Sequence, residues 1–322
     1  MRLSDFYVLN KAGLIPAMII RNRTTVTKRI RLTIAYDGTD YAGFQVQPGL
    51  RTIEGELNRA LTELTGTDIT VIGASRTDSG VHALGNAAVF DYDGPIPPDR
   101  FAPAMLPYLP DDIRIVRSEE VPADWHPRHV SCIKTYCYTY SFGPVENPLT
   151  RRYQSYLRRK PDVRAMQEAA KYLIGEHDFT SFANPSSQVL LAGGSAVRTV
   201  TDIRVSEERS GGLSGTLTPE AGTCSSEVLS SEAEDAPAGG AAGAEIPVSI
   251  GTDCVTVRIY VSGTGFLYNM VRIIAGTLMQ AGTGLWTPER VREALEAKDR
   301  TKAGPTAEAR GLTLIGIHYH ES

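Results

Sequence analysis

The chain is poor in cysteine, and its cysteines are not arranged in pairs. Four occur among 322 residues, at positions 132, 137, 224 and 254. Because no two of them form a Cys-x-x-Cys motif, the spacing predicts neither a zinc site nor a redox pair. His318 and His320 have a spacing that metal ligands can share, but no further ligand lies near them in the sequence. We therefore predict no metal, and a reduced cytoplasmic protein is the simplest interpretation.

Long hydrophobic runs are also absent. No apolar stretch approaches the ~20 residues that cross a bilayer, so we expect no membrane segment. The short stretch from Ala12 to Ile20 contains Pro16 and lacks the ordered features of a signal peptide. We interpret residues 1–28 as a flexible N-terminal extension that precedes the first predicted strand.

Positive charge is scarce in the chain as a whole, whose net charge is −4. Residues 206–252 contain eight acids and one arginine and so carry −7, which leaves +3 on the rest of the chain. This segment has no aromatic residue, so it cannot bury enough apolar surface to offset the entropy of ordering, and we predict a disordered insertion. Outside it, basic clusters at 151–152 and 158–160 are suited to phosphate groups.

Hydrophobic periodicity predicts strands and helices that recur along the chain. Predicted strands cover residues 29–36, 69–74, 87–91, 113–118, 132–142, 200–205, 254–261 and 312–319. Predicted helices cover residues 52–65, with Thr52 as N-cap, 98–106, 162–174, 268–280 and 288–297. This order suits an α+β protein with mainly antiparallel sheets. It divides into an N-terminal half, 29–140, and a C-terminal half, 141–322.

The segment Ser75-Arg76-Thr77-Asp78-Ser79-Gly80-Val81-His82-Ala83 is the richest in chemistry. It lies between two predicted strands, and its composition predicts a tight loop at a sheet edge. A guanidinium beside a carboxylate keeps the carboxylate ionised, as a nucleophile or a proton acceptor requires. The alternative is a turn aspartate paired with a surface arginine, because structural ion pairs have the same composition.

Three tyrosines, Tyr136, Tyr138 and Tyr140, fall on one face of the strand predicted over 132–142. Such a row usually packs in the core or across strands. It can also form a platform on which nucleic-acid bases stack. The spacing favours neither alternative.

The loop at 75–83 resembles the active-site loop of the TruA-type tRNA pseudouridine synthases, with Ser75 and Ser79 in place of a glycine and an alanine. Further segments match that family in the same order, and together they cover about residues 29–205 and 254–319. These segments are residues 36–45, 51–57, 109–113, 134–138, 175–182 and 265–272. Two places depart from the family pattern: residues 125–129 match its Ala-Arg-Phe segment only loosely, and Glu308 replaces a proline.

The resemblance implies the pseudouridine synthase fold, in which two related halves join their sheets and the active cleft lies between them. It implies an isomerase that acts as a homodimer, without a cofactor, on uridines 38, 39 and 40 in the anticodon arm of tRNA. Asp78 matches the catalytic aspartate, which attacks or deprotonates the ribose, and Arg272 matches the arginine that pairs with it. Tyr136 matches the tyrosine that stacks on the target base and assists proton removal from C5. Leu312 would line the uracil pocket. Arg76 is two positions from Asp78, so we expect it to contact RNA phosphate or base edges rather than Asp78.

Two other classes of function fit parts of the pattern. One is a tRNA-binding folding factor whose chemistry is lost or secondary. The intact set of Arg76, Asp78, Tyr136 and Arg272 argues against it. A glycoside hydrolase would pair Asp78 with Asp37 or Asp40. The chain has only two tryptophans, which is few for a sugar cleft.

Overall fold

A computed structural model describes residues 27–209 and 255–320. Its strands are β1 (Lys28–Tyr36), β2 (Ile72–Gly73), β3 (His82–Tyr92), β4 (Ile113–Val121), β5 (Cys132–Phe142), β6 (Ser155–Leu157), β7 (Gly175–Asp178), β8 (Val197–Arg209), β9 (Val255–Gly263) and β10 (Leu312–Tyr319). Its α-helices are α1 (Ile53–Thr65), α2 (Phe101–Met105), α3 (Val163–Lys171), α4 (Gln188–Leu191), α5 (Met270–Gly282) and α6 (Pro288–Glu296).

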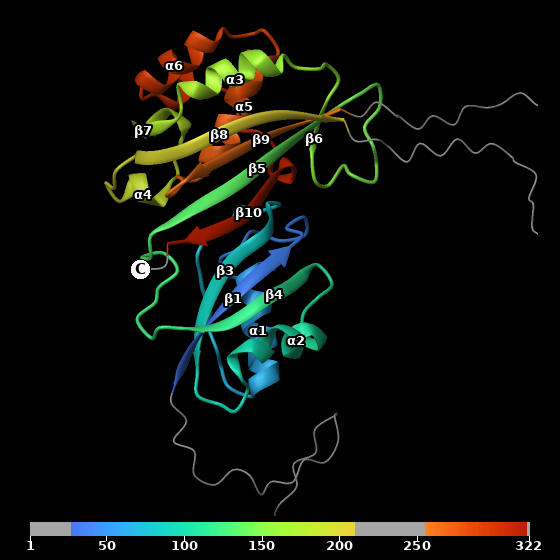
Figure 1. Ribbon diagram of the computed structural model, residues 1–322, viewed down its shortest axis with the longest axis vertical. Helices are drawn as coiled ribbons and strands as arrows, with labels where there is room; N and C mark the ends of the chain where they lie inside the picture. The colour runs from blue at the N-terminus through green and yellow to red at the C-terminus, as the bar shows by residue number, and fades with distance from the viewer. Residues whose placement is uncertain (1–26, 210–254, 321–322) are drawn as a thin grey trace, which may run out of the picture.

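The described strands form one 10-stranded sheet with helices packed against it (Figure 1). Its main path runs β4-β1-β3-β10-β5-β9-β8-β7, with β2 paired to β3 and β6 paired to β5. The pairs β10–β3 and β5–β6 are parallel, and the other described pairs are antiparallel. The predicted α+β class with a mainly antiparallel sheet is therefore confirmed.

In the N-terminal half, α1 and α2 cover the sheet formed by β1, β3 and β4 (Figure 1). Alternate residues of β1 are fully buried in the same core as Leu57 and Leu61 of α1, which is the pattern of a half-buried strand. The Thr52 hydroxyl accepts a hydrogen bond from Gly55 N at 3.2 Å, which confirms the predicted N-cap. The helix ends at Gly66, whose φ of 71° is left-handed.

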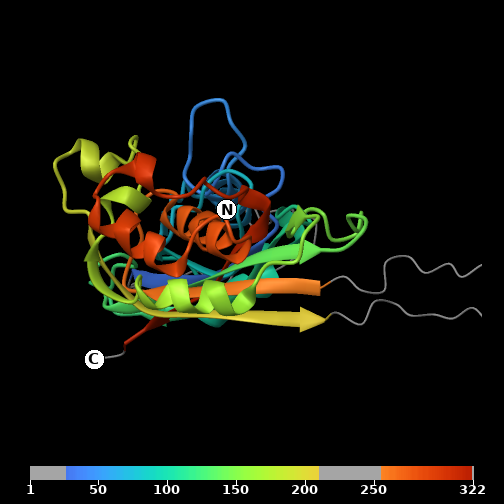
Figure 2. The ribbon, with the colours of Figure 1, turned by 90° about the horizontal axis from the view of Figure 1, so that it is seen from above.

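In the C-terminal half, β9 and β8 lie beside β5, and α3, α5 and α6 pack against these strands (Figures 1 and 2). Most of β5 falls within the range predicted for the N-terminal half, 29–140, but its Tyr138, Tyr140 and Phe142 pack in the core of the C-terminal half. Tyr138 and Tyr140 of β5 are buried in this core with their ring centroids 4.7 Å apart. Core packing is therefore the role of these two tyrosines. Tyr136 differs, because it is partly exposed and contacts the cores of both halves.

The strand β10 joins the two halves, although it is the last element of the chain. Its Thr313 and Leu314 pair in parallel with His82 and Ala83 of β3. Along its other edge it pairs antiparallel with β5. The loop before β3 is thereby placed against the segment before β10, so that a Cβ added at Gly80 would lie 3.3 Å from Ala309 Cβ.

Some predicted boundaries need correction. The strand predicted over 69–74 is reduced to β2, because Val71 N donates to Asn58 Oδ1 at 2.9 Å rather than to a strand. The strand β8 extends to Arg209, so residues 206–209 of the predicted insertion are paired with β9. Residues 210–252 of that insertion and residues 1–26 of the extension lie outside the described residues. Periodicity also misses β6, β7 and α4, which are too short to show it.

No helix in the described ranges is both long and apolar enough to cross a bilayer.

Candidate active site

The loop that carries Asp78 connects β2 to β3 and is held by backbone hydrogen bonds. Phe44 N donates to Thr77 O at 3.0 Å, and Val81 N donates to Asp78 O at 3.1 Å. Gly43 has a φ of 99°, and a Cβ there would lie 2.8 Å from Thr77 O, so only glycine allows this approach. The 41–44 segment therefore fixes the loop from one side.

A buried polar network fixes the base of the same loop. Asn86 Nδ2 donates to Ser75 O at 2.9 Å and to the Tyr36 hydroxyl at 3.1 Å. The Tyr36 and Thr77 hydroxyls lie 2.7 Å apart. Because buried polar groups are costly unless they are paired, this network restricts the loop to one conformation.

The Asp78 carboxylate faces Arg272 of the other half. Arg272 Nη1 donates to Asp78 Oδ2 at 3.3 Å, and the two side chains are only 17% and 15% exposed. Arg272 Nε also donates to Ala307 O at 2.7 Å, and Nη1 to Asn269 Oδ1 at 3.0 Å. Three acceptors therefore hold the guanidinium at the start of α5.

Burial raises the pKa of Asp78 above its ordinary value, and the charge and hydrogen bond of Arg272 oppose that rise. Arg76 does not act on this carboxylate, since its exposed side chain forms no ion pair with the described residues. The alternative of a turn aspartate paired with its neighbouring surface arginine is therefore not what the structure shows, since the ion pair of Asp78 is with Arg272. The arginine beside Asp78 is Arg272, as the family resemblance implied.

Tyr136 lies in β5 with its ring edge-on to Phe266, at a centroid distance of 5.4 Å and an interplanar angle of 90°. Burial raises the pKa of Tyr136 to about 12, the Ser75 hydroxyl opposes this rise, and Asp78 adds to it. The phenol is therefore protonated at neutral pH. The influence of Asp78 also places this ring within electrostatic reach of the carboxylate.

A group of basic residues lies beside the loop. Lys134 Nζ donates to Ala74 O at 3.0 Å. Burial lowers the pKa of Lys134, and the charges of Arg128 and Arg76 lower it further. Arg76 and Arg128 are exposed, and neither side chain forms an ion pair within the described residues. They leave two free guanidinium groups near the active loop.

Leu312 starts β10, where it is buried opposite Tyr138 in the strand register. It belongs to the core of the C-terminal half. The structure thus brings Asp78, Tyr136 and Arg272 together, places Arg76 on the neighbouring surface, and keeps Leu312 in the adjoining core.

Sequence reasoning missed a second network, which involves Asp37. Tyr153 donates to Asp37 Oδ2 at 2.8 Å, and Thr39 N donates to Oδ1 at 2.9 Å. His82 Nδ1 lies 3.1 Å from the same Oδ1. The Asp-Gly-Thr sequence at 37–39 signals the turn, but no local signal predicts a tyrosine more than a hundred residues away. The Tyr153 hydroxyl and the Thr39 amide engage Asp37, which weakens its case as the second carboxylate of a hydrolase.

The described residues contain no group of three or more histidine, cysteine, aspartate or glutamate side chains that could hold a metal ion. Cys132 and Cys137 are free and buried.

Comparison with known proteins gives consistent matches. A family model described as tRNA pseudouridine synthase matches residues 32–129 and 169–320. A tRNA pseudouridine synthase A of Brevibacillus brevis is 41% identical over 293 residues, which cover 91% of this chain and 100% of that protein. Proteins of the same name from Ruminiclostridium cellulolyticum and Clostridium acetobutylicum are 38% and 37% identical, again over 91% of this chain and 100% of theirs.

Proposed function

This chain belongs to the tRNA pseudouridine synthase family, whose members are isomerases, and we propose that it converts uridine to pseudouridine at positions 38, 39 and 40 of the tRNA anticodon stem-loop. The observation that carries the proposal is the Asp78–Arg272 pair. A carboxylate is held there by a guanidinium from the other half, beside a tyrosine ring, on a surface with free arginines.

The reaction breaks the C1′–N1 bond of the nucleotide and forms a C1′–C5 bond. N1 gains a proton and C5 loses one, so the step needs neither an oxidant nor a reductant. Asp78 acts as the nucleophile at C1′ or as the base that deprotonates the ribose, and both roles require the ionised form. Arg272 orients the carboxylate and favours its charge, while burial makes it more basic than an exposed aspartate.

Tyr136 offers an aromatic face and a protonated hydroxyl to the uracil. Because its pKa is about 12, it acts as a neutral phenol, which stacks on the base and donates or relays a hydrogen bond near C5. The edge-on contact with Phe266 fixes the ring for this role. By resemblance to the family, Leu312 would line the uracil pocket from the adjoining core.

The target nucleotide must leave its stack to reach Asp78, which costs a few kcal/mol. Contacts to phosphates offset that cost. Arg76 and Arg128 are suited to make them, since both are exposed and neither has an ion pair among the described residues. By resemblance to the family, the enzyme acts as a cytoplasmic homodimer, and sedimentation of the purified protein tests its oligomeric state.

The positions are tested with tRNA transcripts that carry a single uridine at 38, 39 or 40. Pseudouridine mapping should find product at each of these positions and none at a uridine placed elsewhere in the stem-loop. Equal modification outside this window would contradict the proposed positions.

A further inference from the structure

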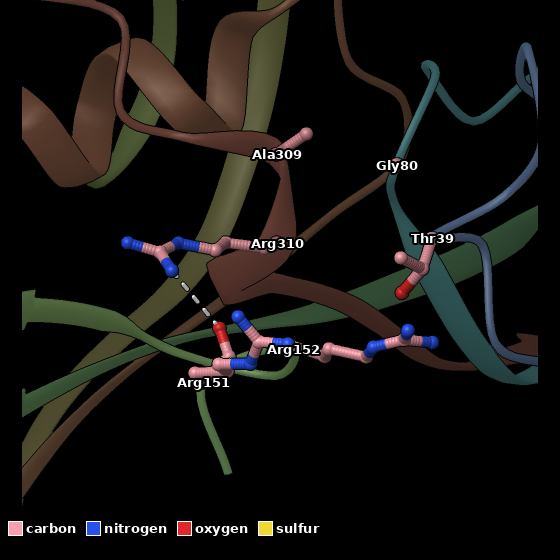
Figure 3. A pocket seen from close by; sticks show the side chains of 6 residues that line it. All are labelled: Thr39, Gly80, Arg151, Arg152, Ala309 and Arg310. Carbon is pink, nitrogen blue, oxygen red and sulfur yellow. Dashed lines mark hydrogen bonds between the residues drawn. The ribbon is translucent and has the colours of Figure 1, made fainter. Parts of the chain in front are cut away.

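A pocket of about 380 Å³ opens beside the active loop and contains three arginines (Figure 3). Its lining residues are Thr39, Gly80, Arg151, Arg152, Ala309 and Arg310. Because Gly80 is two positions after Asp78, their Cα atoms lie within about 7 Å of each other. The pocket is therefore adjacent to the carboxylate but separate from the Asp78–Arg272 pair.

The two neighbouring arginines of the pocket stand on a turn that both halves hold in place. Arg310 Nη1 donates to Arg151 O at 3.1 Å, the dashed line in Figure 3. His82 Nε2 lies 3.0 Å from Arg152 O, and it is the donor there because Nδ1 accepts a hydrogen bond from Gly38 N at 3.1 Å. The turn is thus fixed by a residue of β3 and by a residue that precedes β10.

The charges of the three arginines are not equally compensated. Arg310 contacts Glu308 at 2.6 Å and Glu146 at 3.1 Å. Among the residues that the structure describes, Arg152 has one ion pair, a long contact of 3.8 Å with Asp40. The Arg151 side chain forms no ion pair within the described ranges. The pocket therefore offers one free and one weakly paired guanidinium to an anionic ligand.

We propose that this pocket binds a phosphate group of the RNA backbone that flanks the target uridine, an inference that rests on the proposed function. Guanidinium groups match phosphate with paired hydrogen bonds, and such contacts set the register of a nucleic acid rather than read its sequence. A phosphate held here would place the next nucleotide within reach of Asp78. Because its walls come from both halves, a phosphate bound in the pocket would also align the RNA strand with the cleft between them.

The test measures equilibrium binding of a tRNA anticodon stem-loop in which one flanking phosphate, 5′ or 3′ of the target uridine, is replaced by a neutral methylphosphonate. Arg151→Gln should bind the unmodified RNA about 10-fold more weakly than the wild-type protein. At one flanking position the methylphosphonate should weaken wild-type binding by a similar factor and leave Arg151→Gln unaffected.

Arg158→Gln is the matched control, because Arg158 is also exposed and unpaired in the described part of the chain but does not line the pocket. Replacing the phosphate by methylphosphonate should weaken RNA binding by Arg158→Gln as much as it weakens binding by the wild-type protein. Equal methylphosphonate effects in wild type and Arg151→Gln at both flanking positions would overturn the proposal. If the wild-type protein formed no pseudouridine, the proposed function would fail, whereas a coupling of Arg151 to one phosphate would still establish the pocket.

Discussion

Arg272 Nη1 lies 3.3 Å from Asp78 Oδ2, although 194 residues separate the two positions in the chain. The pair connects a loop of the N-terminal half to the first turn of α5 in the C-terminal half. Its geometry depends on β10, which joins the two halves in one sheet and brings the 304–311 segment beside the loop. The proposed reacting group, Asp78, is therefore paired with Arg272 only when both halves have folded together.

Replacing Arg272 by glutamine should move the acid limb of the pH–rate profile to higher pH. Burial raises the pKa of Asp78, and Arg272 lowers it, so loss of the positive charge allows the pKa to rise further. Because only the ionised carboxylate reacts, kcat/KM would then begin to fall at a higher pH. We also expect kcat at neutral pH to drop about 100-fold, as for other lost charge-stabilising donors.

Arg272→Lys is the control for this variant, since it keeps the charge but loses the forked geometry. Its acid limb should lie between those of the wild type and Arg272→Gln. An acid limb unchanged in Arg272→Gln would show that this arginine does not control the ionisation of Asp78.

Two substitutions of Tyr136 should distinguish the contribution of its aromatic ring to base stacking from the contribution of its hydroxyl to the chemical step. Tyr136→Phe keeps the ring against Phe266, so KM should stay within about twofold while kcat falls by about 100-fold. Tyr136→Leu removes the aromatic face as well, and KM should rise by about 10-fold or more. Steady-state kinetics on tRNA measure both. Full activity in Tyr136→Phe would remove the hydroxyl from the mechanism.

Gly276 of α5 is predicted to tolerate no side chain. A Cβ there would lie 2.0 Å from Pro305 O. The same segment contains Ala307, whose carbonyl oxygen accepts a hydrogen bond from Arg272 Nε. Gly276→Ala should therefore cost about 1–3 kcal/mol of unfolding free energy, although alanine in a helix interior usually stabilises. It should also lower kcat, because the carbonyl that positions Arg272 is displaced.

Urea denaturation of Gly276→Ala and Gly316→Ala measures this effect. An added Cβ at Gly316 meets no heavy atom within 4 Å, so that variant should stay within about 0.5 kcal/mol of the wild type. Equal stabilities of the two variants would contradict the close approach of α5 to the 304–307 segment.

Much of this arrangement follows from local sequence. The bounds of β5 and β10 and the Thr52 cap are as predicted, because period-two patterns and capping residues act over a few positions. The residues Asp78, Tyr136 and Arg272 were identified through family motifs, and the structure places them together. Their roles in the reaction stay predictions.

What sequence could not give is the set of contacts between distant segments. Periodicity does not reveal that β10 pairs in parallel with β3, or that Arg272 rather than Arg76 reaches Asp78. The contact of Arg310 with Arg151 depends on the same long-range closure. Short elements such as β6 are not predicted from periodicity, because β6 is a strand through its pairing with β5 rather than through its own residue pattern.

The central claim is that the Asp78 carboxylate carries the reaction, and Asp78→Asn tests it most directly. The amide has nearly the same shape but can neither attack C1′ nor accept a ribose proton as the carboxylate does. Pseudouridine mapping of an unmodified tRNA should show product at anticodon-arm uridines with the wild-type protein and at least a 1,000-fold lower rate, on the order of nucleophile losses elsewhere, with the variant. The variant should still bind the tRNA, and wild-type rates in Asp78→Asn would contradict the account.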